Sequence, residues 1–531
     1  MLLRCIRFGN RLSSALINPY LPGLIILLLV LAGLRLVFLS ADFPVGAISS
    51  PGMAYTDEGW WSRNAIAFLK TGRWYIDDGY NTIFSLPILP ILQVGWFSIF
   101  GISLTAARLL TVLCLWVIAG LVYAIARREI KSGLAWIAPF IVLSSYPIFV
   151  YSRIALLEMP MLMLILISLW LAIISGDRPA TKLAKIASSA IFFALAVLTK
   201  TSALFALPML VTLVFLQSNR QSNRQLHWPA GWPAGWPANW PAARLYLSKC
   251  RLQSAAIWLL IFAIPVGIFF ELSSHGNSAL SHSYFEDFNV AGKTHKGLLS
   301  VVKGPLRTLK YSFELFPLQL ICLGISLATL IRLKDYRSNL VFQIALLWSL
   351  SILLAFSLSN FAAPRYFVIW IVPVALAVPL AIEHFLIRAS WRKTLFLSIF
   401  SLAVIVSLSQ IAVYLSTAKF TLVNTSKDID AIVAADSTHS ALVMGHFADT
   451  LALASNDISA INDQMGFRDL DYRISVLKPG YYVSYGKIAP SVASKLKAYY
   501  RLELLETFDV YQNYDYGKPV CFYRLTSFQA Q

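Results

Sequence analysis

The sequence predicts a polytopic α-helical membrane protein with about eleven transmembrane helices and a small C-terminal α/β domain on the extracytoplasmic side. Only 13% of the 531 residues are charged and 58% are hydrophobic, whereas soluble domains carry about a quarter charged residues. Apolar runs recur from residue 20 to residue 415, each close to the ~20 residues with which a helix crosses a bilayer. Strands of a β-barrel would be about half as long and would alternate in polarity, so we expect helices.

The apolar runs define a transmembrane domain over residues 1–415 with two outer loops, 41–103 and 274–310. The first run is too long for the apolar core of a signal peptide, which predicts an uncleaved first span. The stretch 83–101 contains two prolines and is expected to lie at the outer interface or to re-enter the membrane. The predicted spans are 20–40, 104–126, 133–152, 159–175, 184–199, 201–217, 254–273, 311–331, 339–359, 366–387 and 394–415.

The net charge of +18 does not indicate nucleic-acid binding, because no soluble segment carries a basic stripe interleaved with aromatic residues. Lys and Arg instead gather in short loops between apolar runs, which is the pattern of cytoplasmic loops. It predicts a cytoplasmic N-terminus and a periplasmic C-terminal domain. Because the chain has no eukaryotic retention signal, we expect a bacterial inner (plasma) membrane. The five cysteines are scattered and predict neither a disulfide framework nor a zinc site.

Residues 416–531 are expected to form a soluble extracytoplasmic α/β domain, because charged residues alternate there with apolar ones. Strands are predicted at Ala441–Met444, Tyr481–Ser484 and Val520–Leu525, and a helix at Ser491–Tyr500. Between two transmembrane spans, residues 228–242 repeat the tetrapeptide WPAG, in which proline forbids a helix. We favour a tolerated loop expansion over a partner-binding segment.

Charged residues at the outer ends of the spans are the candidates for chemistry, because a charge retained at membrane depth is costly. The adjacent carboxylates Asp57 and Glu58 can divide the work of a general base, although a solvated turn is the alternative. Lys200 and Arg365, followed by Tyr366, are cations on the side that is normally poor in them. Phosphate is the group that such cations bind best, while contact with lipid headgroups is the alternative.

Three more residues complete this outer constellation. Glu158 is the last charge before an apolar span, where a carboxylate is also favoured by the helix dipole. Arg153 is a candidate substrate-binding residue or a partner of Glu158, and Trp60 could stack on a sugar or anchor the loop at the interface. Together, outer carboxylates and outer cations describe the transfer of a group from a lipid-linked phosphate to a hydroxyl or amine.

The order of the motifs resembles the GT-C membrane glycosyltransferases, which include protein O-mannosyltransferases, lipid A aminoarabinose transferases and bacterial relatives. The resemblance covers about residues 20–390. It is carried by Asp57-Glu58 after one span and then by PILPILQVGWFSIFGISLTAARLL, SRIALLEMPMLM, LTKTSALFALP and PRYFVIWIVP. The C-terminal domain takes no part in it.

The resemblance implies an inverting glycosyltransferase, a hexosyl or pentosyl transferase with a polyprenyl-phosphate sugar as donor and a glycan, lipid or protein as acceptor. It implies that Asp57 is the general base and that Glu58 orients the base or the substrate. Glu158 stands where many relatives have Asp, and Arg108 corresponds to a family arginine with an expected structural role. Lys200 and Arg365, with Tyr366 beside them, would hold the lipid phosphate.

No cofactor is expected. Some GT-C enzymes need a divalent metal, but this chain has no clear third acidic ligand, Glu314 being the remaining candidate. Three histidines in the outer loop 274–310 have spacings that fit no usual metal site, so this loop is interpreted as a lid over the substrates.

Two other functions compete with the enzyme. A transporter or flippase of lipid-linked sugars predicts charges in the middle of spans and repeats that relate two halves, and the sequence has neither pattern. A non-catalytic scaffold of an envelope glycan complex would not need the Asp57-Glu58 pair.

Overall fold

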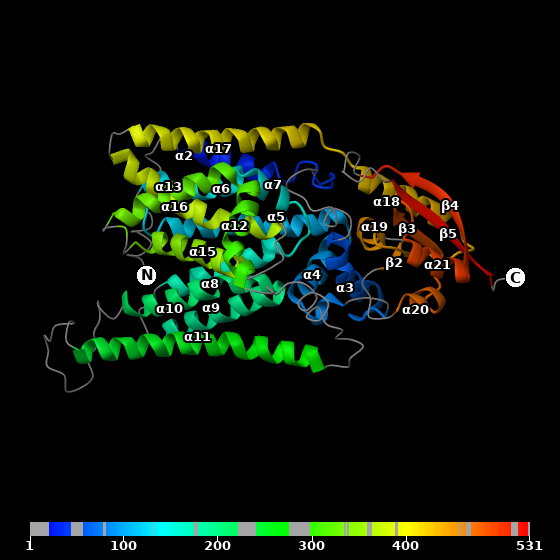
Figure 1. The fold of residues 1–531 in the computed structure, drawn as a ribbon, viewed down its shortest axis with the longest axis horizontal. Helices are drawn as coiled ribbons and strands as arrows, with labels where there is room; N and C mark the ends of the chain where they lie inside the picture. Colours follow the sequence, from blue (N-terminus) through cyan, green and yellow to red (C-terminus); the bar gives the residue numbers. More distant parts are fainter. Residues whose placement is uncertain are drawn as a thin grey trace.

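The computed structural model describes a helical bundle with a five-stranded sheet at one end (Figure 1). The described residues are 21–43, 57–77, 81–130, 132–174, 179–220, 241–275, 298–333, 336, 339–357, 364–387, 391–455, 458–463, 469–510 and 519–528.

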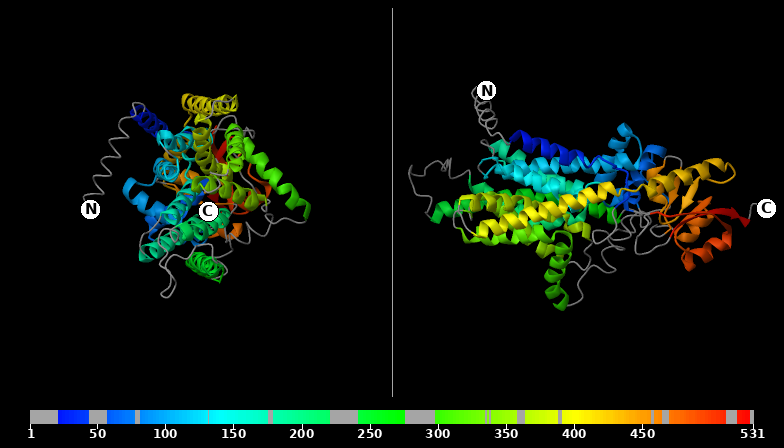
Figure 2. Two further views of the ribbon diagram at one scale, coloured as in Figure 1. Left: turned by 90° about the vertical axis from the view of Figure 1, so that its left-hand side faces the viewer. Right: turned by 90° about the horizontal axis from the view of Figure 1, so that it is seen from above.

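The described helices of the bundle lie mostly side by side along its length (Figures 1 and 2). They are α2 (Leu21–Gly33), α3 (Glu58–Thr71), α4 (Ile88–Phe100), α5 (Leu104–Ala126), α6 (Ile137–Ser144), α7 (Tyr146–Tyr151), α8 (Glu158–Ile173), α9 (Pro179–Thr199), α10 (Leu207–Arg220), α11 (Pro241–His275), α12 (Leu298–Leu315), α13 (Pro317–Arg332), α15 (Leu340–Ser357), α16 (Ile371–Ile387) and α17 (Trp391–Ser416). Short 3₁₀ turns include η2 (Thr82–Phe84), η3 (Ser132–Trp136), η4 (Thr201–Ala206) and η6 (Pro364–Trp370).

Five described helices are long and apolar enough to cross a membrane, and a sixth span results if a bent pair is counted as one. The five coincide with the spans predicted at 104–126, 254–273, 339–359, 366–387 and 394–415. The remaining predicted spans fall on apolar helices of 10–17 residues or on the bent pair. The chain is therefore an integral membrane protein, and the number of about eleven spans stays a prediction.

Two predicted spans are not straight helices. The span at 133–152 is interrupted at Ser145, which has an extended backbone between α6 and α7. The span at 311–331 is bent by 120° between α12 and α13, because Pro317 cannot continue the preceding helix. As a result α12 crosses the bundle (Figure 2), and its first turns occupy residues that the sequence assigned to an outer loop. The stretch expected at the interface contains η2 and the thirteen-residue helix α4.

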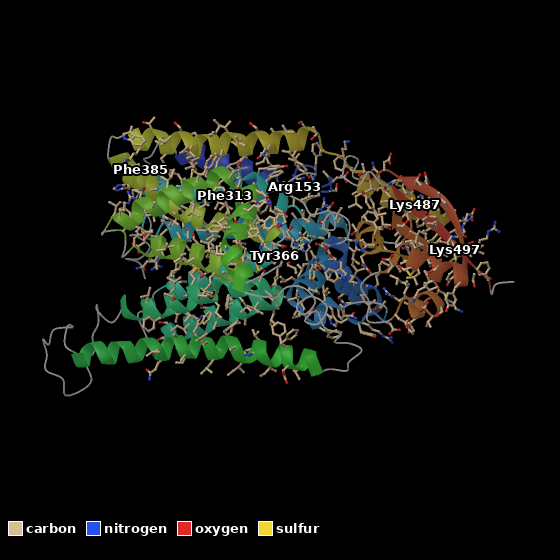
Figure 3. The ribbon with its side chains drawn as sticks, viewed as in Figure 1. Arg153, Phe313, Tyr366, Phe385, Lys487 and Lys497 are labelled. Atoms are coloured by element: carbon tan, nitrogen blue, oxygen red, sulfur yellow. The ribbon has the colours of Figure 1, made fainter. Side chains whose placement is uncertain are left out.

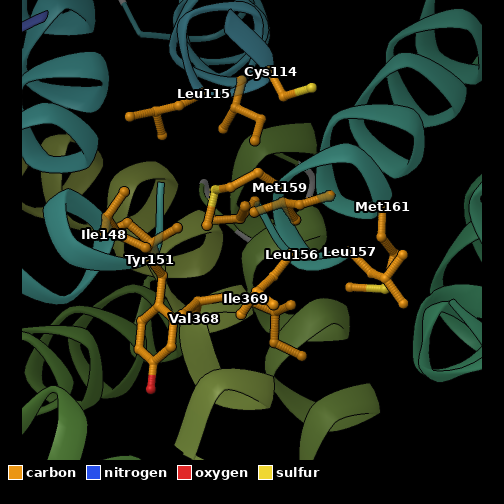
Figure 4. Close-up of a cluster of buried hydrophobic side chains, with 14 of the residues drawn as sticks. Cys114, Leu115, Ile148, Tyr151, Leu156, Leu157, Met159, Met161, Val368 and Ile369 are labelled. Atoms are coloured by element: carbon orange, nitrogen blue, oxygen red, sulfur yellow. The ribbon is translucent and has the colours of Figure 1, made fainter. Parts of the chain in front are cut away.

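A buried apolar cluster joins the segments that carry the candidate site (Figure 4). Leu157 and Met159, which flank Glu158, pack in the same cluster as Val368 and Ile369, which follow Arg365. Interiors at this packing density transmit displacement with little slack. The backbones of α8 and η6 are therefore fixed relative to each other directly beneath the site.

The C-terminal region, residues 417–528, holds the strands of a mixed sheet in the order β2-β1-β3-β5-β4. The first three strands in this order, β2, β1 and β3, run parallel to one another. Strand β5 is antiparallel to both of its neighbours, β3 and β4. The strands are β1 (Leu442–Met444), β2 (Ser459–Ile461), β3 (Tyr481–Tyr485), β4 (Tyr500–Phe508) and β5 (Val520–Ser527), and the helices are α18 (Thr421–Ala435), α19 (Ala448–Ala454), α20 (Leu470–Ser475) and α21 (Pro490–Tyr499).

The three predicted strands correspond to β1, β3 and β5, and the predicted helix corresponds to α21. The sequence missed β2, which has only three residues, and β4, whose charged residues mask its alternation. The separateness and the extracytoplasmic location of this region remain predictions. The tetrapeptide repeat up to residue 240 and the loop residues 276–297, with two of the three histidines, lie outside the described residues.

One acidic side chain ties the C-terminal region to the first outer loop. Asp42, just after the first helix, accepts hydrogen bonds from the amides of Thr421 (2.9 Å) and Leu422 (3.1 Å) and from the hydroxyl of Thr421 (2.6 Å). These amides open α18 and have no partner within the helix. A carboxylate from a distant segment thus caps the helix on which the C-terminal region begins.

We expect Asp42→Ala to destabilise the start of α18 by roughly 1–2 kcal/mol, because two helix-opening amides lose their acceptor. Hydrogen exchange of the amides of residues 421–424 measures it. Asp428→Ala, at an exposed position on the same helix, is the control and should leave these amides unchanged. Equal exchange in both variants would contradict the capping role.

Candidate active site

The Asp57-Glu58 pair lies at the beginning of α3, and its two carboxylates point to different partners. Consecutive residues of a helix are rotated by about 100°, so neighbouring side chains diverge. Asp57 occupies the N-cap position without capping its own helix, and Glu58 opens the first turn. Asp57 and Glu58 therefore contact different parts of the protein.

Glu58 is buried and fully engaged by the protein. Its carboxylate accepts hydrogen bonds from Nε (2.8 Å) and Nη2 (2.6 Å) of Arg108 on α5 and from the amide of Ala155 (2.8 Å). Arg108 also donates to the carbonyls of Leu39 (3.0 Å) and Ala41 (2.6 Å). All of these contacts of Arg108 are made within the protein, which agrees with the structural role that the resemblance implied. Of the roles expected for Glu58, orientation of the base through α3 is compatible with these contacts, and it stays a prediction.

Asp57 and Glu158 instead face two cations. Arg365, in η6, forms an ion pair with Asp57, and its Nε lies 3.4 Å from Oε1 of Glu158. Lys200, which follows α9, forms an ion pair with the same Glu158 oxygen. Four segments of the chain thus meet in one group of alternating charges, as their shared placement at the outer ends of spans predicted.

This charge cluster (Asp57, Glu158, Lys200 and Arg365) is almost enclosed. Asp57 and Arg365 keep 16% and 15% of their side-chain surface exposed, whereas Lys200 and Glu158 keep 7% and 3%. The Tyr366 ring lies under the Lys200 ammonium, 4.1 Å from nitrogen to ring centroid. Such contact stabilises the cation. The accessible edge of the cluster is therefore the Asp57–Arg365 side.

Burial lowers the pKa of Lys200 to about 8, although the neighbouring Glu158 carboxylate opposes this effect. Lys200 lies between two apolar helices and outside both of them. A group with this pKa is protonated at neutral pH and loses its charge in mildly alkaline solution. The cation that an anionic ligand would meet is thus sensitive to pH.

Two sequence-predicted binding residues are placed elsewhere. Arg153 does not pair with Glu158; it donates to the carbonyls of Val37 (2.7 Å) and Phe38 (2.5 Å) and stacks against Phe149 and Tyr414. Figure 3 shows Arg153 and Tyr366 in the half of the bundle nearer the sheet. Arg153 thus holds the end of the first helical segment, where Phe38 has a positive φ of 53°.

Trp60, which was expected to stack on a sugar or to anchor the loop at the interface, is also buried within the protein. It is 6% exposed and packs on Trp61 with ring centroids 4.6 Å apart. Stacking on a sugar and anchoring at the membrane interface both require an accessible ring face. In this conformation Trp60 contributes to the packing of α3.

The charge cluster does not have the donor set of a metal site, because each carboxylate already meets a cation. Within the described part of the chain, no group of three or more His, Cys, Asp or Glu side chains could hold a metal. Glu314, the remaining acidic candidate, is 43% exposed and lies 3.9 Å from Lys310 on the same helix. A metal-independent reaction remains a prediction.

The comparisons with known proteins agree with this arrangement of helices and sheet. Residues 86–231 match the model of the dolichyl-phosphate-mannose-protein mannosyltransferase family. ArnT from Cupriavidus metallidurans bound to undecaprenyl phosphate superposes with a TM-score of 0.58, at 14% identity, over 95% of this chain and 98% of that chain. The apo state of the same ArnT superposes with a TM-score of 0.52, at 16% identity, over 94% of this chain and 98% of that chain. No curated protein sequence gives a significant match.

This chain has a GT-C fold. The resemblance of the motifs to the GT-C superfamily is confirmed at that level, and the likeness extends over the C-terminal region, which the motifs did not cover. At 14–16% identity a structural likeness establishes the fold alone. The reaction has to be argued from the charge cluster.

We expect Glu58→Gln to destabilise the protein by about 3–5 kcal/mol, because it leaves the buried Arg108 guanidinium without its counter-charge. Asp57→Asn should cost less, because Arg365 keeps Glu158 as a partner. Thermal unfolding in detergent, followed by size-exclusion chromatography of the soluble fraction, compares the two variants. The structural assignment of Glu58 fails if Glu58→Gln unfolds at the temperature of wild type.

Proposed function

We propose that this protein is an inverting glycosyltransferase that moves a sugar from a polyprenyl-phosphate donor to an acceptor at the outer face of a bacterial inner membrane. The observation that carries the proposal is the charge cluster, where two cations and two carboxylates from four segments of the chain meet. The binding of undecaprenyl phosphate by ArnT, which has the same fold, supports a polyprenyl phosphate as donor.

The donor phosphate would take over the two cations. Without ligand, Lys200 and Arg365 are neutralised by Glu158 and Asp57. The donor phosphate is a diester with one negative charge, and its two free oxygens can accept charge-assisted hydrogen bonds from both cations at once. When Arg365 turns to the phosphate, Asp57 loses its ion-pair partner and becomes available to accept a proton. Donor binding and activation of the base are then the same event.

The chemical step follows from these positions. The acceptor hydroxyl or amine gives its proton to Asp57, and its heteroatom attacks the anomeric carbon from the side opposite the phosphate. The bond between this carbon and the phosphate oxygen breaks, and its electrons leave with the polyprenyl phosphate. Lys200 and Arg365 stabilise the charge that develops on this leaving group. Attack from the opposite face inverts the anomeric configuration.

The reaction places limits on its substrates without naming them. The sugar is a hexose or a pentose, and the acceptor is a glycan, a lipid or a protein on the same side as Asp57. No cofactor takes part in the proposed step. Glu158 keeps Lys200 and Arg365 apart and charged, and its longer side chain replaces the aspartate of many relatives.

We expect Asp57→Asn to lower turnover by about 10²–10⁴-fold, the usual contribution of a general base. Binding of the donor should persist or tighten, because Arg365 loses a competing carboxylate. The measurement compares both proteins in nanodiscs with a panel of polyprenyl-phosphate sugars for sugar transfer, and with undecaprenyl phosphate for binding. Near-normal turnover in Asp57→Asn would remove Asp57 as the base. Binding of donor lipids without transfer by wild type would favour the flippase or the scaffold.

We expect Lys200→Ala to weaken binding of undecaprenyl phosphate by tenfold or more, because one charge-assisted hydrogen bond is lost (about 1.5–3 kcal/mol). Wild-type affinity should also fall as the pH rises through about 8, since Lys200 then loses its proton. Lys200→Arg should retain affinity and lose this pH dependence, because arginine does not titrate there. Identical pH profiles of wild type and Lys200→Arg would exclude Lys200 from the phosphate site.

A further inference from the structure

The helix that begins with Asp57-Glu58 is held on a second side by the C-terminal region. Helix α19 lies against α3 so closely that a Cβ on Gly59 would stand 2.2 Å from the carbonyl carbon and oxygen of Asp449. These are main-chain atoms and cannot swing aside. Glycine at position 59 is therefore required by the approach of α19, two residues after the candidate base.

The side chain of Asp449 makes a second contact with α3. Its Oδ1 lies 3.6 Å from Nε of Arg63, one helical turn after Gly59, and the exposed fractions of the two side chains are 1% and 4%. Its Oδ2 accepts a hydrogen bond of 3.1 Å from Asn462 at the end of β2. A buried ion pair persists only where both charges are held in good geometry. Asp449 thus connects α3 to the sheet.

Further contacts follow α3 and the chain after it. Lys70, in the last turn of α3, donates to the carbonyl of Ile458 (3.4 Å), and the hydroxyl of Tyr472 donates to Asp77. The C-terminal region thus holds this segment at its beginning and at its end. Of these contacts, those of Gly59 and Arg63 lie within the first two turns, next to the candidate base.

We propose that Asp449 is a positioning residue for Asp57. The proposal rests on the function proposed above. Glu58 fixes one face of the first turn of α3 to α5, and the next turn is held to α4 and η2, where Ser62 accepts from Gln93 and Asn64 accepts from Thr82. Asp449 holds a further face of the same two turns through Gly59 and Arg63. A displacement of about 1 Å of a reacting group can cost 10²-fold in rate, so loss of this contact should misplace the base.

This arrangement separates catalysis from donor binding. Lys200 and Arg365 are carried by the end of α9 and by η6, neither of which is α3. Loosening α19 should therefore misplace Asp57 and leave the phosphate cations where they are. A merely structural role of Asp449 would lower the amount of folded protein and leave the turnover of each folded molecule unchanged.

The test uses the full-length protein in nanodiscs and three variants. Asp449→Asn removes the charge and can still accept from Asn462; Asp449→Ala removes both contacts; and Gly59→Ala displaces α19 without touching its side chains. Asp471→Asn is the matched control, because it removes an ion pair with Lys495 whose side chains are 47% and 40% exposed in the same region. Hydrogen exchange of the amides of residues 60–64 and the transfer kinetics are measured on each.

We expect faster exchange of these amides in Asp449→Ala and Gly59→Ala, together with a kcat lowered about 10–100-fold and an unchanged affinity for undecaprenyl phosphate. Asp449→Asn should show a smaller loss of kcat, and Asp471→Asn should match wild type. Unchanged exchange in Asp449→Ala, or faster exchange with normal kcat, would overturn the proposal. If wild type binds the donor and transfers no sugar, the proposed function itself fails, whatever the exchange shows.

Discussion

The buried pair between Glu58 and Arg108 is the interaction on which the arrangement of the candidate site depends. Neither charge can leave water cheaply, and each is accepted in the interior only because the other, with main-chain groups, satisfies it. The amide of Ala155 donates a further hydrogen bond to the carboxylate, and the carbonyls of Leu39 and Ala41 accept further hydrogen bonds from the guanidinium. Four segments of the chain are thereby fixed at one point, immediately beside Asp57.

The charge cluster has a different character from this pair. Asp57 and Arg365 remain partly accessible, and Arg365 divides its charge between two carboxylates. In the proposed mechanism Arg365 exchanges Asp57 for the donor phosphate, whereas Glu58 and Arg108 stay paired. The mechanism thus assigns one ion pair to building the site and another to the chemical step. The two adjacent acids of the sequence motif belong to these two different classes.

Much of the site could be predicted from the sequence, because membranes sort charges by depth. Lys200, Arg365, Glu158 and Asp57 were grouped because each lies at the outer end of a span, and the structure brings them into contact. The long spans were predicted from the length of their apolar runs, and three of the strands from the alternation of apolar and polar residues. The direction of individual side chains could not be predicted, because it depends on tertiary packing.

Arg153 illustrates that limit. In the sequence it lies five residues before Glu158, which made an ion pair plausible, yet main-chain carbonyls and two aromatic rings bind it instead. The bend before α13 was missed because an apolar run looks the same whether its helix is straight or broken. Asp449 carried no signal at all. An aspartate in a polar region stands out only when the structure shows it buried against Arg63.

The hydrogen bonds of Asp42 have a consequence for the order of synthesis. Their partners, Thr421 and Leu422, leave the ribosome hundreds of residues after Asp42 does, once the final long helix has been made. Until then the first outer loop lacks its anchor, and α3 has no C-terminal region to lie against. A nascent or prematurely terminated chain can therefore insert its helices in the membrane without assembling the outer site. The site is complete only after the C-terminal region has been made.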